Sequence, residues 1–359
     1  MAPRVRLADA ADLEQWDARA VEAAPGNVLQ SRAWARHRER LGWTAHFLVV
    51  DETLPVLALT RPWRLVGGSS AYVSRGPIPV ADAATTADHL VAVTGWLAER
   101  GADVVAADPE VPTDTGLPEQ LQSAGYHQIE EIQPTRHRLD LELPTSGDAD
   151  PVFRGFSSTT RNLIRAAERQ GLVVREIGVA GAASPETVDA GLKLLYGMLH
   201  ETSRRRKFWL ASSSTFRSWL SEAIADRLAF VLVVERPDGV PLGAASFHRH
   251  GDRLTYALSG ERTSARRDHP GATRLLLWHA IRLAMAEHRT LMDLSGVDVR
   301  GARRRPLAGE PEHGMLLFKE SFGARWVDMT GAHEKVIRPG RYLAGRVVER
   351  AVRLVPGRG

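Results

Sequence analysis

Cysteine is absent from all 359 residues of the chain. This absence excludes disulfide bonds, thiolate zinc sites, iron–sulfur clusters and a cysteine nucleophile. Long apolar runs are missing too, because no stretch approaches the roughly 20 residues that span a bilayer as a helix. The opening residues, MAPRVRLADAADLEQW, lack the apolar centre that is typical of a secretory signal. These absences lead us to expect a cytoplasmic protein.

Neither sign of charge dominates, since 47 lysines and arginines stand against 43 acidic residues, a net charge of +4. So small an excess does not distinguish nucleic acid, phosphate or anionic lipid as a partner. With 43% hydrophobic and 25% charged residues, the composition is ordinary for a soluble protein with a full core. Because the length exceeds that of one typical domain, we expect two domains.

The two halves of the chain repeat one order of predicted elements. Each half begins with a helical stretch, SRAWARHRERLGW in the first and FRSWLSEAIADR in the second. Apolar runs around short polar turns then predict hairpins, and alternating and helical patterns predict the later strands and helices. A hairpin, strand, helix and strand are predicted over 46–64, 69–79, 85–101 and 102–111, and again over 230–251, 253–261, 271–289 and 290–299.

This order is typical of the acetyltransferase, or GNAT, fold. The sequence therefore predicts an α/β (α+β) protein with two tandem GNAT-like domains. Pro, Gly, Ser and Asp cluster in LDLELPTSGDADP, which favours a domain boundary there. We expect a first domain over 1–145, a second over 146–345 and a basic tail over 346–359, whose amphipathic pattern favours a helix.

Seven motifs resemble, in order, those of the Fem aminoacyl-tRNA-dependent transferases, which build peptidoglycan cross-bridges. Together they extend over most of the chain, and the fifth includes the family's Arg-x-x-Ile-x-x-Ala helix. The fourth is similar to the strand that closes the family's first domain. The seven stretches are LQSRAWARHRERLGW, AYVSRGPIP, AADPEV, IQPTRHRLDLELP, FSSTTRNLIRAAERQGLVV, DLSGV and GMLLFKESFG.

The resemblance implies tandem GNAT-like domains and a defined reaction. No long heptad insertion separates the predicted helices, so the chain is similar to members without a coiled-coil arm. In the family, an amine of a peptidoglycan precursor attacks the ester carbonyl of an aminoacyl-tRNA. An amide forms without ATP, metal or other cofactor. The acceptor is lipid-linked or nucleotide-linked, and in other Fem-like proteins it is a different amine.

The stretch GMLLFKESFGARW places a single lysine, Lys319, among apolar residues. Aminolysis of an ester needs a group that stabilises the developing oxyanion. The resemblance implies that Lys319 is this group and that Phe318 lines the channel for the aminoacyl-adenosine end. The alternative is a lysine that extends along an amphipathic helix to water.

Four further residues are site candidates by resemblance. Asp108 directly follows the predicted strand ADVVAA, where a carboxylate serves as a base or orienting acceptor, or caps the next turn. Tyr72 in AYVSRGPIP and Tyr256 in the second half correspond to substrate-binding positions, although a strand tyrosine equally fits the core. Arg38 corresponds to a family residue that contacts acceptor phosphate, a role suited to its planar fork. A solvated helix face is the alternative for Arg38.

One departure from the family pattern bears on the acceptor. Where the family carries an arginine and, four positions later, an aromatic residue facing the acceptor, this chain has Ala211 and Thr215. The usual contacts to a nucleotide-linked muropeptide are then missing. The departure favours a lipid-linked acceptor or one outside the cell wall.

Basic side chains are the candidates for tRNA phosphates. Arg161 and Arg165 are four residues apart and share one face of a predicted helix. Charge runs are more often solvated faces than binding sites, and that interpretation stays open. The predicted tRNA-binding residues are Arg161, Arg165, Arg204, Arg205 and Arg206; Arg303, Arg304 and Arg305 form a second basic run. The basic tail allows a peripheral contact with the inner membrane face.

Other functions are weighed against this one. A GNAT enzyme that uses acyl-CoA needs an Arg/Gln-x-x-Gly-x-Gly/Ala loop, and ARRDHPGATRLL lacks that spacing. Fem-like enzymes that act on natural products fit the departure at Ala211. A non-enzymatic protein that binds tRNA or phosphate with a decayed site is disfavoured by the retained Phe318–Lys319 pair. His248 and His250 share a strand face, but without a carboxylate neighbour they give only a weak metal signal, so no metal is predicted.

Overall fold

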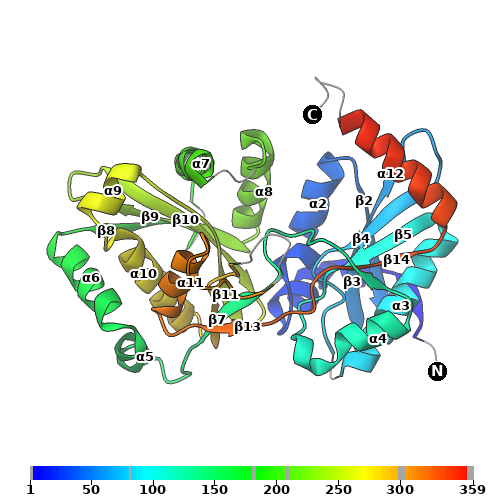
Figure 1. Cartoon of the computed structure of the whole chain (residues 1–359), viewed down its shortest axis with the longest axis horizontal. Coiled ribbons are helices and arrows are strands. Elements are labelled where there is room, and N and C mark those ends of the chain that lie inside the picture. Colours follow the sequence, from blue (N-terminus) through cyan, green and yellow to red (C-terminus); the bar gives the residue numbers. More distant parts are fainter. Residues whose placement is uncertain (1–2, 81, 180–182, 207–209, 298–303, 354–359) are drawn as a thin grey trace. The chain divides into compact units, whose positions relative to one another are not determined.

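The computed structural model describes residues 3–80, 82–179, 183–206, 210–297 and 304–353. The chain divides into two compact units (Figure 1). Unit 1 consists of Met1–Arg136 together with Asp328–Gly359, and unit 2 consists of His137–Val327. Each unit therefore has its own sheet, helices and buried core.

Unit 1 is built on a seven-stranded mixed sheet in the order β1-β2-β3-β4-β5-β14-β6. β4 and β5 run parallel because helix α3 (Ala83–Glu99) crosses between them, and the other neighbours are antiparallel. Leu90, Val93 and Leu97 of α3 belong to the core. The strands are β1 (Val5–Leu7), β2 (Thr44–Val50), β3 (Leu54–Pro62), β4 (Ser69–Val73), β5 (Ala102–Ala107), β6 (His127–Gln128) and β14 (His333–Val336); its α-helices include α1 (Ala10–Glu14), α2 (Arg32–Arg40), α4 (Leu117–Ser123) and α12 (Pro339–Arg353).

Unit 2 repeats this plan with the strand order β13-β7-β12-β11-β10-β9-β8. Helix α10 (Ala272–Ala286) crosses between the parallel strands β11 and β12. The strands are β7 (Arg138–Glu142), β8 (Val173–Ile177), β9 (Ala229–Glu235), β10 (Pro241–His250), β11 (Arg253–Glu261), β12 (Leu291–Asp293) and β13 (Arg325–Val327); the helices include α5 (Asp150–Gly155), α6 (Ser158–Arg169), α7 (Pro185–Arg206), α8 (Ser213–Ala225), α9 (Thr263–Asp268) and α11 (His313–Glu320).

The predicted repeat is confirmed in its order: hairpin, strand, crossover helix and parallel strand occur in both units. A turn at Asp238-Gly239 closes the hairpin of β9 and β10, with a hydrogen bond of 2.9 Å from the Arg236 N–H to the Val240 carbonyl oxygen. Gly239 has φ +80°, a conformation that side chains disfavour. The fold class is therefore the one that the sequence indicates.

The domain boundaries differ from those expected. The stretch IQPTRHRLDLELP does not close the first sheet, because β7 pairs with β12 and β13 and buries Leu139 and Leu141 in the unit 2 core. Unit 1 ends at Arg136 instead of residue 145, and the chain returns to it at Asp328. There β14 pairs with β5, and α12 comes after it. Residues 328–345 thus belong to unit 1, a correction to the expected second domain.

Both parallel pairs stop pairing at a polar position. In unit 1 the last partners are Val73 and Ala107, and Asp108 comes next. In unit 2 the last partners are Thr255 and Asp293, while β11 continues beside β10 to Glu261. Ligand sites of open α/β sheets lie at such carboxyl ends. The carboxyl ends of β4 and β5 and of β11 and β12 are therefore the expected places for a functional site.

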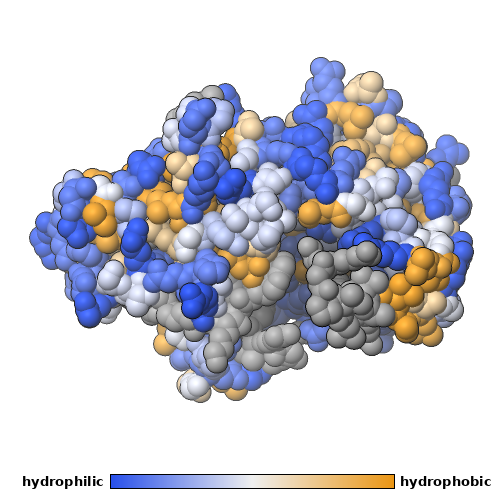
Figure 2. Space-filling model, turned by 90° about the horizontal axis from the view of Figure 1, so that it is seen from above, coloured by the Kyte–Doolittle hydropathy of each residue, from blue (hydrophilic) through white to orange (hydrophobic). Residues whose placement is uncertain are grey.

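On the face seen in Figure 2, hydrophobic side chains form separate patches between hydrophilic ones. Within the described ranges, no helix combines the length and the apolar character needed to cross a membrane.

A glycine pair tests the packing of α7 on β11. A Cβ on Gly260 would lie 2.5 Å from the main-chain carbon of Met198, whereas a Cβ on Gly197, in the same helix, would meet nothing within 4 Å. Gly260→Ala should therefore lower the free energy of unfolding by about 1–3 kcal/mol. Gly197→Ala should raise it by about 0.5–1 kcal/mol, because glycine is unfavourable within a helix. Urea unfolding of both variants measures this, and equal stabilities would contradict the close approach.

Candidate functional site

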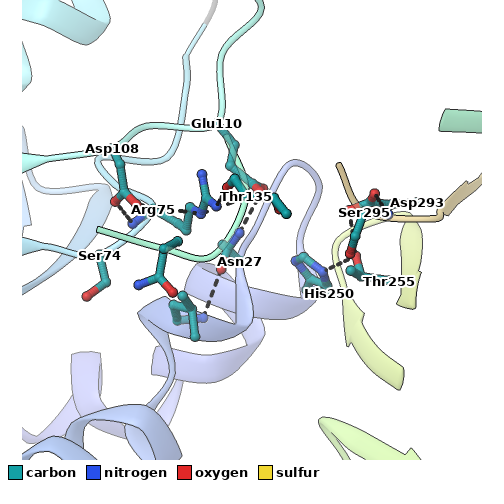
Figure 3. Close-up of polar contacts among 12 residues, drawn as sticks. Asn27, Ser74, Arg75, Asp108, Glu110, Thr135, His250, Thr255, Asp293 and Ser295 are labelled. Carbon is teal, nitrogen blue, oxygen red and sulfur yellow. Dashed lines mark hydrogen bonds and ion pairs between the residues drawn. The ribbon is translucent and has the colours of Figure 1, made fainter. Parts of the chain in front are cut away.

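Asp108 and Tyr72 form the centre of a buried cluster in unit 1. Asp108 directly follows β5 and is 1% exposed. The Tyr72 hydroxyl, from β4, lies 2.9 Å from both carboxylate oxygens, and the Arg75 main-chain N–H donates to Oδ1 at 2.7 Å. The structure thus brings together two residues that the sequence predicts separately. Figure 3 shows Asp108 with Arg75.

Arg75 is a member of this cluster that sequence reasoning missed. Its Nε lies 3.7 Å from an Asp108 oxygen and 3.8 Å from a Glu110 oxygen, and its Nη2 donates to the Thr135 carbonyl oxygen at 2.6 Å. Gln133 donates to the Tyr72 hydroxyl at 2.9 Å. The only signal for Arg75 was its place three residues after Tyr72 in the motif AYVSRGPIP.

The electrostatics of the cluster result from burial. Burial raises the pKa of Asp108 to about 6, against the opposing effects of the Arg75 charge and the hydrogen bonds from Arg75 and Tyr72. Burial also raises the pKa of Tyr72, and the Asp108 charge adds to this effect. For Arg75 burial lowers the pKa, but the carboxylates of Asp108 and Glu110 more than offset it. A carboxyl group that titrates close to neutral pH can accept a proton from a bound amine.

Arg38 is half-buried on α2, so the solvated-face interpretation does not hold for it. Its guanidinium lies 5.3 Å from the ring centre of Trp34 and 4.7 Å from that of Trp43. Burial lowers the pKa of Arg38, and the positive charge of nearby Arg61 lowers it further. The buried Nε makes no hydrogen bond with the described residues. Arg38 and Arg61 together place two positive charges around Trp43, which suits an anionic group.

Lys319 is 5% exposed on α11, so the interpretation of a lysine reaching for water is wrong. Its Nζ donates to the carbonyl oxygens of Ser295 and Gly296, each at 3.0 Å. Phe318 packs against the core, with the Arg274 guanidinium 5.0 Å from its ring centre. The ammonium group is therefore a fixed positive charge at the loop after β12.

The same loop is held from β11. Ser295 has φ +60°, and its N–H donates to Asp293 Oδ1 while its hydroxyl donates to the Tyr256 carbonyl oxygen, both at 2.7 Å. Tyr256 thus shares the loop with Lys319 through its main chain. Its ring lies in the core against Phe247, and burial raises its pKa to about 12. The core alternative therefore describes the Tyr256 ring, and its substrate-binding role stays a prediction.

Asp293 also anchors a chain of hydrogen bonds that the sequence did not reveal (Figure 3). The Thr255 hydroxyl donates to Asp293 Oδ2 at 3.0 Å, so it accepts from His250 Nε2 at 2.8 Å. His250 Nδ1 then accepts from Arg253 at 3.2 Å. These partners set one tautomer of a neutral imidazole.

Two further titratable groups lie on the unit 2 sheet. Opposite Asp293, burial and the Asp293 charge raise the pKa of Asp140 to about 6, although Arg138 opposes this. His248 packs against Trp219, and burial lowers its pKa to about 4. Across the described ranges, no three His, Cys, Asp or Glu side chains are grouped so that they could hold a metal ion.

The predicted tRNA-binding arginines do not share one environment. Arg161 donates to the carbonyl oxygens of Arg154 and Phe156, so it caps α5. Arg165 is exposed over Phe153, and Arg204 is exposed near the end of α7. The side chains of Arg205 and Arg206 lie outside the described residues, as does all of Arg303. Arg304 and Arg305 form ion pairs with Glu310 and Glu320 at 2.6 and 2.5 Å.

Ala211 and Thr215 have local structural contacts. The Ala211 carbonyl oxygen accepts from the Tyr196 hydroxyl at 3.0 Å. The Thr215 N–H donates to the hydroxyl of Ser212, which caps the N-terminus of α8. Ala211 therefore lies just before α8, and Thr215 lies in its first turn.

Comparison with known proteins agrees with this architecture. Residues 154–304 match a family described as an acetyltransferase (GNAT) domain. Among curated proteins, none matches the chain. The crystal structure of FemX is similar with a TM-score of 0.77 at 16% identity, over 95% of this chain and 99% of that one.

Two further solved structures are similar over nearly their whole length. One is the C-terminal domain of a putative lysylphosphatidylglycerol synthetase from Agrobacterium fabrum, with a TM-score of 0.55 and 14% identity over 98% of both chains. The other is L-PGS from Bacillus licheniformis, with a TM-score of 0.53 and 12% identity over 95% of this chain and 97% of that one. The fold is therefore the FemX-type tandem GNAT fold, as the Fem resemblance implied.

The raised pKa of Asp108 gives a stability test with a defined sign. Between the ordinary pKa of 3.8 and about 6, the folded protein binds more protons than the unfolded chain, so this group's contribution to stability falls as pH rises. Asparagine cannot ionise. The free energy of unfolding of Asp108→Asn, relative to that of wild type, should therefore rise by up to about 3 kcal/mol between pH 4 and pH 7.

Urea unfolding across this pH range measures the gain. Asp82→Asn is the matched control, because exposed Asp82 caps α3 and its pKa is lowered by the Thr85 N–H and hydroxyl. The free energy of unfolding of Asp82→Asn, relative to that of wild type, should fall as pH rises, because the lowered pKa of Asp82 stabilises the wild type at higher pH. A pH-independent difference for Asp108→Asn would show that Asp108 does not titrate in this window.

Proposed function

We propose that the chain is an aminoacyltransferase that moves an amino acid, such as glycine, alanine or serine, from aminoacyl-tRNA to an amine of a peptidoglycan precursor. The amide formed belongs to an interpeptide bridge. The observation that carries the proposal is the buried Lys319 ammonium, held at the end of the parallel strand pair in a chain with the FemX-type fold. A cytoplasmic location follows from these substrates.

The reaction joins the acceptor nitrogen to the aminoacyl carbonyl carbon and breaks the ester C–O bond to the tRNA. The acceptor amine loses a proton, and the released tRNA hydroxyl gains one, so no further reactant is needed. Asp108 would hold the amine and take its proton, since its pKa of about 6 lies close to neutrality. Lys319 would stabilise the oxyanion as a charge positioned before the reaction starts.

Other predicted residues are assigned to the two substrates. Arg38 would contact acceptor phosphate, because burial against Trp34 and Trp43 strengthens its interaction with an anion. Tyr72 orients Asp108 towards the acceptor amine. Phe318 would line the donor end beside Lys319, and Tyr256 supports the Lys319 loop. Arg161, Arg165, Arg204, Arg205 and Arg206 are proposed to contact tRNA phosphates.

Both crossover helices disfavour acyl-CoA as the donor. A pyrophosphate needs an accessible helix N-terminus. At the start of α10, a Cβ on Gly271 would lie 2.2 Å from the Leu163 carbonyl oxygen, so α6 occupies this end. At the start of α3, the Asp82 carboxylate accepts the Thr85 N–H at 2.7 Å and would repel an anion. An aminoacyl-tRNA donor has no such requirement.

A second candidate differs only in the acceptor. The Ala211 carbonyl oxygen accepts from Tyr196 and the Thr215 N–H donates to Ser212, and neither side chain offers a guanidinium or an aromatic ring. This favours an acceptor other than the nucleotide-linked muropeptide. It is either a lipid-linked precursor or an amine of a natural product.

The proposal is tested by supplying labelled aminoacyl-tRNAs together with nucleotide-linked precursor, lipid-linked precursor or simple amines. We expect a product heavier by one aminoacyl residue, and its formation should stop after ribonuclease treatment. Acetyl-CoA with the same acceptors is the matched alternative. Product from acetyl-CoA, and none from aminoacyl-tRNA, would overturn the proposal.

Lys319→Met separates a catalytic ammonium from a structural one. The carbonyl groups of Ser295 and Gly296 lose their hydrogen-bond donor, so the free energy of unfolding should fall by about 1–3 kcal/mol. If Lys319 stabilises the oxyanion, turnover per folded molecule should also fall by about 10²-fold or more. Turnover is measured at a temperature where circular dichroism shows the variant to be folded.

Ser295→Ala is the matched control. It removes the hydroxyl bond to Tyr256 from the same loop but leaves the ammonium. It should lower stability with turnover within about threefold of wild type. If both variants lose turnover equally, the loop geometry and not the charge determines the rate.

A further inference from the structure

Helix α12 is fixed on unit 1 by a buried carboxylate. Asp103 of β5 is fully buried, and it accepts from Arg341 Nε and Trp63 Nε1, each at 3.0 Å. Gly345 lies against the Trp63 ring so closely that a Cβ there would be 2.4 Å from it. These contacts determine which face of the helix is turned to the protein. The opposite face is therefore turned outward.

The outward face of α12 carries apolar side chains. Leu343 is 62% exposed and Val347 is 66% exposed, and they are one helical turn apart. Arg346, also exposed, stands on the adjoining turn. An exposed apolar stripe bordered by arginine is the pattern of a helix that lies in a membrane interface.

A turn from elsewhere in the sequence adds to this surface. Residues 63–68 form the turn between β3 and β4, closed by the Trp63 N–H and the Gly68 carbonyl oxygen, and Trp63 places it beside α12 (Figure 1). Leu65 in this turn is 97% exposed and has φ +67°, which a leucine rarely adopts. Arg64 beside it is exposed as well. A leucine held outward in this way gains nothing from the protein's own core.

We propose that Arg64, Leu65, Leu343, Arg346 and Val347 form a docking face for the surface of an anionic lipid bilayer. The apolar side chains would enter the boundary between headgroups and acyl chains, and the arginines would pair with lipid phosphates. A second copy of the chain fits less well, because the arginines would face each other across a two-fold interface. The inference rests on exposure and charge, and it holds whatever reaction the chain catalyses.

Vesicle sedimentation with the full chain tests the docking face. We expect binding to vesicles of equimolar phosphatidylglycerol and phosphatidylcholine, little binding to phosphatidylcholine alone, and weaker binding as salt rises. The triple variant Leu65→Ser, Leu343→Ser, Val347→Ser should reduce binding about tenfold or more. Arg64→Gln with Arg346→Gln should reduce binding and weaken its salt dependence.

The control variant removes exposed apolar side chains from unit 2. Leu307 and Val173 are 60% and 53% exposed, so Leu307→Ser with Val173→Ser should leave vesicle binding unchanged. All variants should keep the wild-type thermal midpoint, because the altered side chains are at the surface. Equal loss in the control and triple variants, or no binding by wild type, would overturn the proposal. So would a dimer in analytical ultracentrifugation that only the triple variant abolishes.

Discussion

Each unit buries charged side chains at the end of its parallel strand pair, and these charges constrain the structure around them. A buried charge is tolerated only with hydrogen-bond partners and opposing dipoles. In unit 1 one of these groups is the Asp108 carboxylate, which accepts hydrogen bonds from the Tyr72 hydroxyl and the Arg75 main-chain N–H. In unit 2 one of them is the Lys319 ammonium, which donates hydrogen bonds to two carbonyl oxygens. The ends of the parallel strands therefore carry buried polar groups.

The two units share a fold but hold this corner with different partners. Asp108, directly after β5, accepts from Tyr72 and from the Arg75 main-chain N–H, whereas Asp293, at the end of β12, accepts from Thr255 and from the Ser295 N–H. Asp293 thereby fixes the start of the loop whose Ser295 carbonyl oxygen accepts from Lys319. In unit 2 this loop also holds the Lys319 ammonium, so the repeated architecture carries a buried carboxylate in both copies and a buried lysine beside it in the second.

Local sequence patterns indicated the repeated elements because alternation, helical periodicity and turn residues act over a few positions. Asp108 was singled out partly on such a pattern, since it directly follows an apolar strand, and its role stays a prediction. The burial of Lys319 could not be predicted from local sequence. Its hydrogen-bond acceptors, the carbonyl oxygens of Ser295 and Gly296, lie more than twenty residues earlier, in a loop of unusual backbone conformation. The chain from His250 to Asp293 needs the register of three strands, which no single motif encodes. The domain boundary was misplaced because β7 and β14 reveal their sheet only through pairing.

The return of β14 to the first sheet has a consequence for biosynthesis. β6 pairs only with β14 in the described part of the sheet, and β5 has β14 as its second neighbour. While a ribosome is still translating unit 2, β5 is an edge strand with open main-chain groups, and such edges recruit other chains. Unit 2 has all of its strands by residue 327, before unit 1 has its last one. The second half of the chain can thus mature first, and the first half must wait for it.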